Sequence, residues 1–72
     1  MDDNEKRNED KLDFFLKEKL KIHVERKDRK FWNGILIDKK SDGVYLFNDD
    51  KFGEIFLFSS DVWEVEEYRG DE

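Results

Sequence analysis

The side chains that most often carry out catalysis are scarce in this chain. It contains one histidine, His23, and no cysteine. A nucleophilic dyad needs a second such residue, and a structural zinc site needs several. The 20 Asp and Glu residues are spread over turns and termini and show no pairing pattern. We therefore expect no enzyme activity, no metal and no cofactor.

A second group with possible chemistry is the densest basic cluster, formed by Arg26, Lys27, Arg29 and Lys30. Phe31 and Trp32 follow it directly. Cations beside aromatic rings can hold the phosphates and stack the bases of a single-stranded nucleic acid. The alternative is a charged hairpin turn that blocks association of sheet edges. The sequence leaves both readings open.

Charge and hydropathy limit the partners. The 72 residues carry a net charge of −6, which disfavours duplex DNA but leaves room for RNA at a small local site. The longest apolar run, Ile55 to Phe58, is too short to cross a membrane. The N-terminal stretch MDDNEKRNED is polar, unlike a signal peptide. We expect a cytoplasmic protein without a membrane partner.

Size and composition add two expectations. A chain of this length buries only roughly 60% of its unfolded surface, and small domains often gain stability by self-association. The chain lacks Ala, Pro, Thr, Gln and Cys and is rich in Lys, Asp, Glu, Phe and Ile. This composition is typical of an AT-rich source such as a phage or a low-GC microbe, and a thermophile would share several of these features.

A single domain over residues 1–72 must position these groups. Residues 9–20 are expected to form an amphipathic helix, with Asn8 as its N-cap and Leu12, Phe15, Leu16 and Leu20 on one face. Residues 1–8 are expected to be flexible, and residues 67–72 to form an acidic tail. Period-two patterns and turn signals predict a five-stranded unit over residues 21–66. Its strands are expected at residues 21–26, 31–38, 44–47, 54–58 and 62–66.

Two features of these strands bear on architecture. Gly34 lies inside the second strand, where glycine usually marks a bend, a bulge or a close backbone approach. The strands at 44–47 and 55–58 are apolar on both faces, whereas a sheet in a small monomer normally keeps one face wet. One helix cannot easily cover both faces. We therefore expect strand-to-strand association between copies of the chain.

From residue 10 to residue 66 the chain resembles the Sm-like superfamily, which includes the Lsm proteins and the bacterial Hfq family. The matching segments are LDFFLKEKL, then KIHVERKDRKFWNGILI with WNGIL as its glycine-centred core, and EIFLFSSDVWEV, which is similar to the second Sm motif. The resemblance implies a mainly β fold. In that fold an N-terminal helix precedes a strongly bent, five-stranded antiparallel barrel of the SH3-like type.

The resemblance also implies a cyclic homo-oligomer of about five to seven subunits. In the family, the fourth strand of one subunit pairs with the fifth strand of the next. The corresponding interface candidates are Ile55, Phe56, Leu57, Phe58, Val62, Trp63 and Val65.

Family members bind RNA through two loops near the pore. The corresponding RNA-binding candidates are Lys39, Lys40, Ser41 and Asp42 in the first loop and Ser59 and Ser60 in the second. An ordinary solvated turn and a tight strand corner are the alternatives. The family's base-holding Asp and Asn are replaced by Lys40 and Val44. The family's Arg-Gly or Lys-His corner is replaced by the two serines.

These observations give two main expectations for function, and a monomeric barrel that acts as an adaptor is a third, which the apolar strand at 55–58 argues against. The first is an Sm-like homo-oligomeric ring that binds or scaffolds single-stranded RNA. The alternative is a ring-forming protein-interaction module that has lost the usual RNA site. The basic turn favours RNA, whereas the acidic charge and the replaced family residues favour the alternative.

Overall fold

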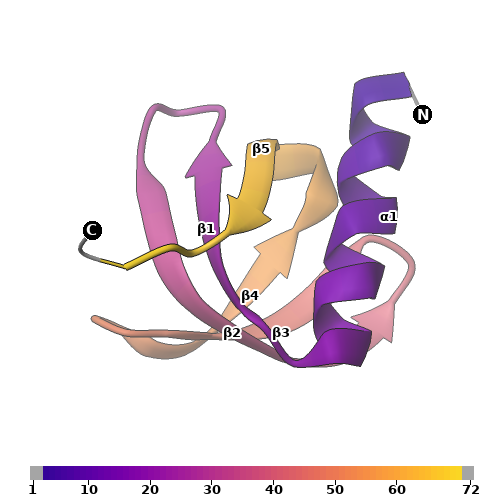
Figure 1. Ribbon diagram of the computed structural model, residues 1–72. Coiled ribbons are helices and arrows are strands. Elements are labelled where there is room, and N and C mark those ends of the chain that lie inside the picture. The colour runs from indigo at the N-terminus through magenta and orange to yellow at the C-terminus, as the bar shows by residue number, and fades with distance from the viewer. Residues whose placement is uncertain (1–2, 71–72) are drawn as a thin grey trace.

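The structure, a computed structural model, describes residues 3–70. These residues form α1 (Asp3–Glu18), β1 (Lys21–Arg26), β2 (Phe31–Ser41), β3 (Val44–Asp49), β4 (Gly53–Phe58), the 3-10 turn η1 (Ser59–Asp61) and β5 (Val62–Glu67). The prediction of a mainly β chain with an N-terminal helix is confirmed. Figure 1 shows α1 standing along one side of the curved sheet.

The strands form one open antiparallel sheet in the order β4-β3-β2-β1-β5. Each of the first four strands is joined to the next by a short turn, and β5 returns to pair with β1. Within the described residues, β4 and β5 are therefore the two edges of the sheet. Each edge strand has a neighbour on one side only.

The core lies between the inward face of this sheet and α1. Inward-facing positions alternate along the strands, as Ile22 and Val24 in β1 and Tyr45 and Phe47 in β3 illustrate. Leu12 of α1 is fully buried against them. The buried apolar residues are Leu12, Ile22, Val24, Leu36, Tyr45, Phe47, Leu57, Val62 and Val65.

Gly34 allows β2 and β3 to approach each other closely. A Cβ atom at this position would collide with the carbonyl oxygen of Asn48, so any side chain would force the two backbones apart. Further along β2, the register shifts between Leu36 and Asp38 and again between Lys39 and Ser41. Such irregularities bend a strand and increase its twist. The expectation that Gly34 marks a special backbone position is confirmed.

The helix begins earlier than predicted, at Asp3, and residues 3–8 belong to it instead of forming a flexible segment. Asn8 is not an N-cap. It is fully buried, and its amide nitrogen donates to the carbonyl oxygens of Val62 and Trp63, each at 3.2 Å. Arg7 adds an ion pair of 3.9 Å to Glu64 of β5. The first turns are helical because they dock on β5, a tertiary contact that the polar sequence does not reveal.

The helix also ends earlier than predicted, at Glu18. The amides of Lys19 and Leu20 donate to the carbonyl oxygens of Leu16 and Phe15, and Lys19 has a φ of 57°. This is the Schellman arrangement, in which glycine usually occupies the left-handed position. At the other end of the chain, Glu67 is still part of β5, and the amide of Tyr68 donates to the carbonyl oxygen of Lys21. The expected acidic tail thus begins after a paired segment, and residues 71–72 lie outside the described range.

Candidate functional site

The turn between β1 and β2 is a compact, charged loop. The amide of Arg26 donates to the carbonyl oxygen of Lys30 at 2.7 Å, and the amide of Lys30 donates to the carboxylate of Asp28 at 3.0 Å. The amide of Lys27 donates to the carbonyl oxygen of Asp61, which ties the turn to η1. Arg29 sits at the tip with a φ of 70°.

The four basic residues of this turn divide into two classes. The guanidinium of Arg26 lies 4.4 Å from the centre of the Trp32 ring and pairs with Asp28 and Asp61 at 3.4 and 3.9 Å. Lys27, Arg29 and Lys30 are exposed, and no described carboxylate pairs with their side chains. Arg26 therefore holds the turn, while the other three cations are available to a ligand.

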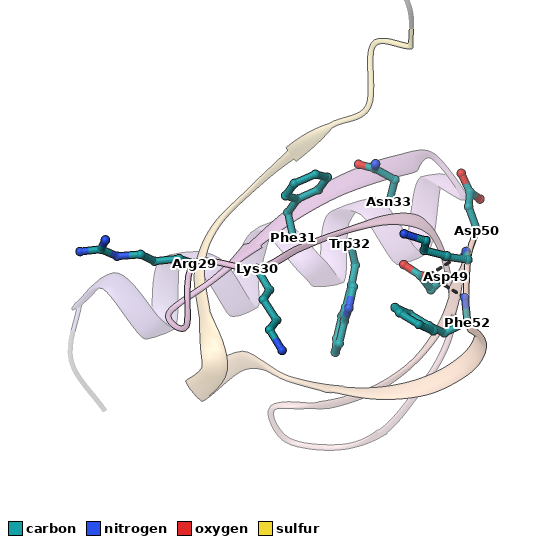
Figure 2. Close-up of a pocket in the computed structure, with 9 residues that line it drawn as sticks. Arg29, Lys30, Phe31, Trp32, Asn33, Asp49, Asp50 and Phe52 are labelled. Carbon is teal, nitrogen blue, oxygen red and sulfur yellow. Dashed lines mark hydrogen bonds between the residues drawn. The ribbon is translucent and has the colours of Figure 1, made fainter.

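Two of these cations border a groove of about 590 Å³, here called the Trp32 groove. One wall comes from the β1–β2 turn and the start of β2, and the other comes from the β3–β4 turn. Its lining residues are Arg29, Lys30, Phe31, Trp32, Asn33, Asp49, Asp50, Lys51 and Phe52. Figure 2 shows Lys30, Trp32 and Phe52 projecting to one side of the β2 backbone, whereas Phe31 and Asn33 project to the other.

The rings of Trp32 and Phe52 differ in how much of each is packed against the rest of the protein. Trp32 is half-buried and stacks on Phe47, with 6.3 Å between ring centres and 24° between ring planes. Phe52 is 66% exposed. A supported ring together with a solvent-exposed one is an arrangement that accepts a flat apolar group between or against them.

The acidic residues of the Trp32 groove are already engaged. The Asp49 carboxylate accepts hydrogen bonds from the amides of Lys51 and Phe52 at 2.7 and 2.8 Å (Figure 2). The Asp50 carboxylate pairs with the ammonium of Lys21 at 2.6 Å. Lys51, like Arg29 and Lys30, has no ion-pair partner among the described residues. The groove thus combines aromatic faces with unpaired positive charge, although the chain as a whole is acidic.

Sequence reasoning found the basic side of this groove but missed Lys51 and Phe52. They lie on the β3–β4 turn, which is distant in sequence, and only the sheet brings the two turns together. The amide of Asp50 donates to the carbonyl oxygen of Asn33 at 2.8 Å, which fixes this approach. The available signal was Phe52 itself, a large apolar residue in an otherwise polar turn.

The two segments that hold the predicted RNA-binding candidates, residues 39–42 and 59–60, meet at one end of the sheet. The amide of Ser59 donates to the carbonyl oxygen of Gly43, directly after the first segment, at 2.9 Å. However, β2 extends to Ser41, so Lys39 and Lys40 lie in a strand and not in a loop. Ser59 is buried, and Ser60 and Asp42 are exposed. The loop prediction for the two lysines is wrong because the bulges in β2 let it pair with β3 up to Ser41.

Both lysines are also engaged with carboxylates. Lys39 pairs with Asp13 of α1 at 3.0 Å and lies 3.9 Å from Glu9. Its hydrogen bond to Asp13 raises the pKa of Lys39. Lys40 pairs with Asp38 at 3.2 Å, and this contact lowers the pKa of the Asp38 carboxyl. This end of the sheet therefore offers less free positive charge than the β1–β2 turn.

The predicted interface residues also divide into two classes. The side chains of Leu57, Val62 and Val65 are buried in the core of their own chain, so a partner cannot reach them, and Ile55 is half-buried. Phe56, Phe58 and Trp63 are exposed by 57%, 43% and 61%. Sequence alternation could not separate these classes, since both faces of β4 are apolar.

The exposed phenylalanines of β4 belong to a wider outer apolar face. In the β3–β4 pair, Phe56 lies opposite Leu46 and Phe58 lies opposite Val44. Residues that lie directly opposite each other share a face of the sheet. Ile35 and Ile37 of β2 are also exposed, on the side opposite the buried Gly34 and Leu36. The outer apolar face comprises Ile35, Ile37, Val44, Leu46, Phe56 and Phe58.

Two further features of residues 3–70 bear on function. No three His, Asp or Glu side chains in this range gather closely enough to hold a metal ion. No helix in the same range has the length and apolar character that crossing a membrane requires. Comparison with protein-family models, curated proteins and solved structures found no significant match to this chain.

Proposed function

We propose that the protein is a self-assembling, Sm-like module that binds single-stranded RNA. The Sm-like assignment is supported by the order of elements, a helix followed by five strands, and by the strand order β4-β3-β2-β1-β5. The close approach at Gly34, in the middle of the WNGIL segment, adds to this support. The assignment rests on these features and on the sequence resemblance together.

Self-assembly is supported by the two open edges. An unpaired edge carries free backbone N–H and C=O groups that favour pairing with another strand. β4 is such an edge, and its outer side presents Phe56 and Phe58. Pairing of β4 in one subunit with β5 in the next is head-to-tail, so repetition closes a ring when the rotation permits. About five to seven subunits fit the family pattern.

The observation that carries RNA binding is the Trp32 groove. The residues that line this groove include the rings of Trp32 and Phe52 and the unpaired cations Arg29, Lys30 and Lys51. Figure 2 shows the Lys30 side chain on the same side of β2 as Trp32, whereas the Arg29 side chain extends away from the two rings. Stacking on aromatic rings together with phosphate contacts is the usual basis of single-strand recognition. We therefore propose the β1–β2 turn as the RNA site, in place of the candidates near the β2–β3 turn and in η1.

Removal of two groove cations tests this placement. The double variant Lys30→Ala with Lys51→Ala should bind a single-stranded RNA more weakly. The dependence of log K on log salt should flatten by about 0.7 for each phosphate that the variant no longer neutralises. The matched control is Lys17→Ala with Lys40→Ala, which removes the same charge from exposed positions outside the groove. Equal affinity and equal salt slope in the two double variants would contradict the placement.

The alternative function, a protein-interaction module without RNA affinity, is favoured by one specific observation. The outer apolar face spans three adjacent strands, and four of its six side chains are exposed. A contiguous exposed apolar surface of this kind is typical of protein–protein contact. A protein that assembles but leaves RNA unbound at low salt would support this alternative.

A further inference from the structure

A second groove lies beside the same β1–β2 turn. It has a volume of about 520 Å³ and is here called the Trp63 groove. Its lining residues are Glu25, Arg26, Lys27, Arg29, Lys30, Phe31 and Trp63. Arg29, Lys30 and Phe31 thus line both grooves. The tip of the turn separates two concave surfaces and supplies cations to each.

The Trp63 groove repeats the chemistry of the Trp32 groove. Phe31 is 60% exposed and Trp63 is 61% exposed, although both are large apolar rings. Lys27 adds a third unpaired cation at this groove. Arg26 is engaged with Asp28. The exposed Glu25 carboxylate lies 3.8 Å from the His23 ring, a contact that is an ion pair only when His23 is protonated. Aromatic faces and free cations therefore occur on each side of the turn.

We propose that a single-stranded RNA crosses the β1–β2 turn, stacking one base in the Trp32 groove and another in the Trp63 groove. The phosphates between these bases lie over Arg29 and Lys30. This inference rests on the proposed RNA-binding function and specifies the path of the strand. It also requires no base-specific contact, because every base offers a flat face for stacking.

The backbone at the tip fits this role. Arg29 has a φ of 70°, a left-handed conformation that is uncommon for residues other than glycine, asparagine and aspartate. A long cationic side chain is thus held at a position where turn geometry alone would favour a small residue. Strained positions of this kind tend to occur at binding sites. Arg29 lines both grooves, and its side chain extends outward from the tip of the turn (Figure 2).

The path is compatible with self-assembly through β5. Pairing at a sheet edge uses backbone groups, whereas side chains stand on the faces of the strand. Trp63 is exposed on such a face, beside Phe31 of β2. An RNA strand in the Trp63 groove and a neighbouring β4 strand at the β5 edge therefore use different groups of β5.

The two tryptophans of the chain allow a direct test, because one lies in each groove. Trp63→Phe leaves Trp32 as the sole indole, and Trp32→Phe leaves Trp63, while phenylalanine keeps an aromatic face in each case. Each variant is titrated with an unstructured A- and U-containing oligoribonucleotide of about eight nucleotides, within the usual range of single-strand site sizes. We expect the fluorescence of both reporters to change with the same midpoint. If the oligonucleotide changed the fluorescence of Trp32 but not that of Trp63, the two-groove path would be overturned.

A second variant keeps the test independent of how Trp32→Phe folds. Trp63→Ala changes an exposed side chain and should weaken binding of the same oligonucleotide about tenfold, the effect expected for one stacked base. Phe14→Ala, which removes an exposed ring from α1, is the matched control and should bind like the original chain. Unchanged affinity in Trp63→Ala would refute the path while leaving the Trp32 groove in place. Absence of binding by the original chain would instead refute the proposed function itself.

Discussion

At the scale of single residues, Asp13 connects the helix to the sheet. Its carboxylate accepts a hydrogen bond from the hydroxyl of Tyr45 at 2.7 Å and pairs with Lys39 at 3.0 Å. Burial, together with this carboxylate, raises the pKa of Tyr45, so its hydroxyl keeps its proton and remains a donor. The Lys39 ammonium also lies 5.5 Å from the centre of the Tyr45 ring. Because of these contacts we expect Lys39 to contribute to stability, and the proposed RNA site lies elsewhere.

Lys39→Ala tests this assignment. The substitution leaves Asp13 without its ion-pair partner, so the free energy of unfolding should fall by about 1 kcal/mol. The affinity for single-stranded RNA should stay the same, since Lys39 lies outside both grooves. Chemical denaturation and an RNA titration of the same preparation measure the two effects. A large drop in affinity with unchanged stability would return Lys39 to the RNA site.

Glu64 makes the docking of α1 sensitive to acid. A hydrogen bond from Lys11, at 3.0 Å, lowers the pKa of Glu64. Because the folded pKa lies below the unfolded value of about 4.3, the ionised Glu64 stabilises the fold above that value, and this stabilisation disappears as the pH falls through the folded pKa. The melting temperature of the original chain should therefore exceed that of Glu64→Gln at about pH 7 and match it at about pH 2. If the difference in melting temperature stayed constant over this pH range, the ionisation of Glu64 would not be the cause of the acid sensitivity.

At the scale of elements, β2 organises the molecule. It is the central strand of the sheet, pairs with β1 and β3, and packs against α1. The glycine and the two register shifts within it allow one strand to follow a curved path around the core. Its first residues line both grooves, while its last residues contact α1 through Lys39. The position of β2 therefore sets both the core and the candidate RNA site.

Gly34→Ala should be the most damaging small substitution in this element. The added methyl group would collide with the backbone oxygen of Asn48, which cannot move away without opening the β2–β3 pair. We expect the free energy of unfolding to fall by about 3 kcal/mol or more. Thermal unfolding followed by circular dichroism measures this loss of stability.

Gly53→Ala is the matched control for this substitution. No atom lies within 4 Å of a Cβ at Gly53, so only the φ of +78° is unfavourable. The cost there should be about 1 kcal/mol. Equal destabilisation at the two glycines would mean that close approach of β2 and β3 is not what requires glycine at position 34.

At the scale of the whole molecule, an acidic chain presents three kinds of surface: two open edges, an outer apolar face that reaches the β4 edge, and a basic turn between two grooves. The edges and the apolar face favour contact with other copies of the chain. The basic turn favours a polyanion. Because these surfaces are distinct, we expect the proposed assembly and the proposed RNA binding to be separable by substitution.

Phe56→Asp should separate the two properties. Phe56 is exposed, so a charge there is tolerated by a single folded chain but disfavours a contact beside the β4 edge. Analytical ultracentrifugation should show an oligomer for the original chain and the mass of one chain for the variant. Phe31→Asp, at an exposed ring of a central strand, is the control and should keep the oligomer. A single-chain mass for the original protein would contradict self-assembly.

The sequence predicted the elements better than their contacts. The five strands and the special role of Gly34 followed from local patterns, because alternation and turn residues are properties of neighbouring positions. Residues 3–8 were missed because a buried Asn8 amide, which is a tertiary contact, holds them in the helix. The end of the helix was missed because Lys19 stands where glycine is usual.

At the candidate site, too, local features could be predicted from the sequence, whereas long-range contacts could not. The basic turn was visible as a cluster of cations, and its neighbouring aromatics were visible as well. Phe52 and Lys51 were not, because only the curved sheet brings the β3–β4 turn to the β1–β2 turn. The loop lysines were misplaced because pairing of β2 with β3 continues past the expected strand end. Both errors, the missed residues of the β3–β4 turn and the misplaced lysines, depend on pairing between strands, which cannot be read from the order of residues in one sequence.

Binding of single-stranded RNA at a local basic site is the property on which the function proposed for this acidic chain depends. It can be measured by fluorescence anisotropy of labelled U-rich, A-rich and mixed-sequence RNA oligonucleotides, titrated with the purified protein over a series of salt concentrations. We expect saturable binding that weakens as salt rises, because the phosphates release counterions when Arg29, Lys30 and Lys51 contact them. Absence of binding at low salt would contradict the RNA-binding function and favour the protein-interaction module instead.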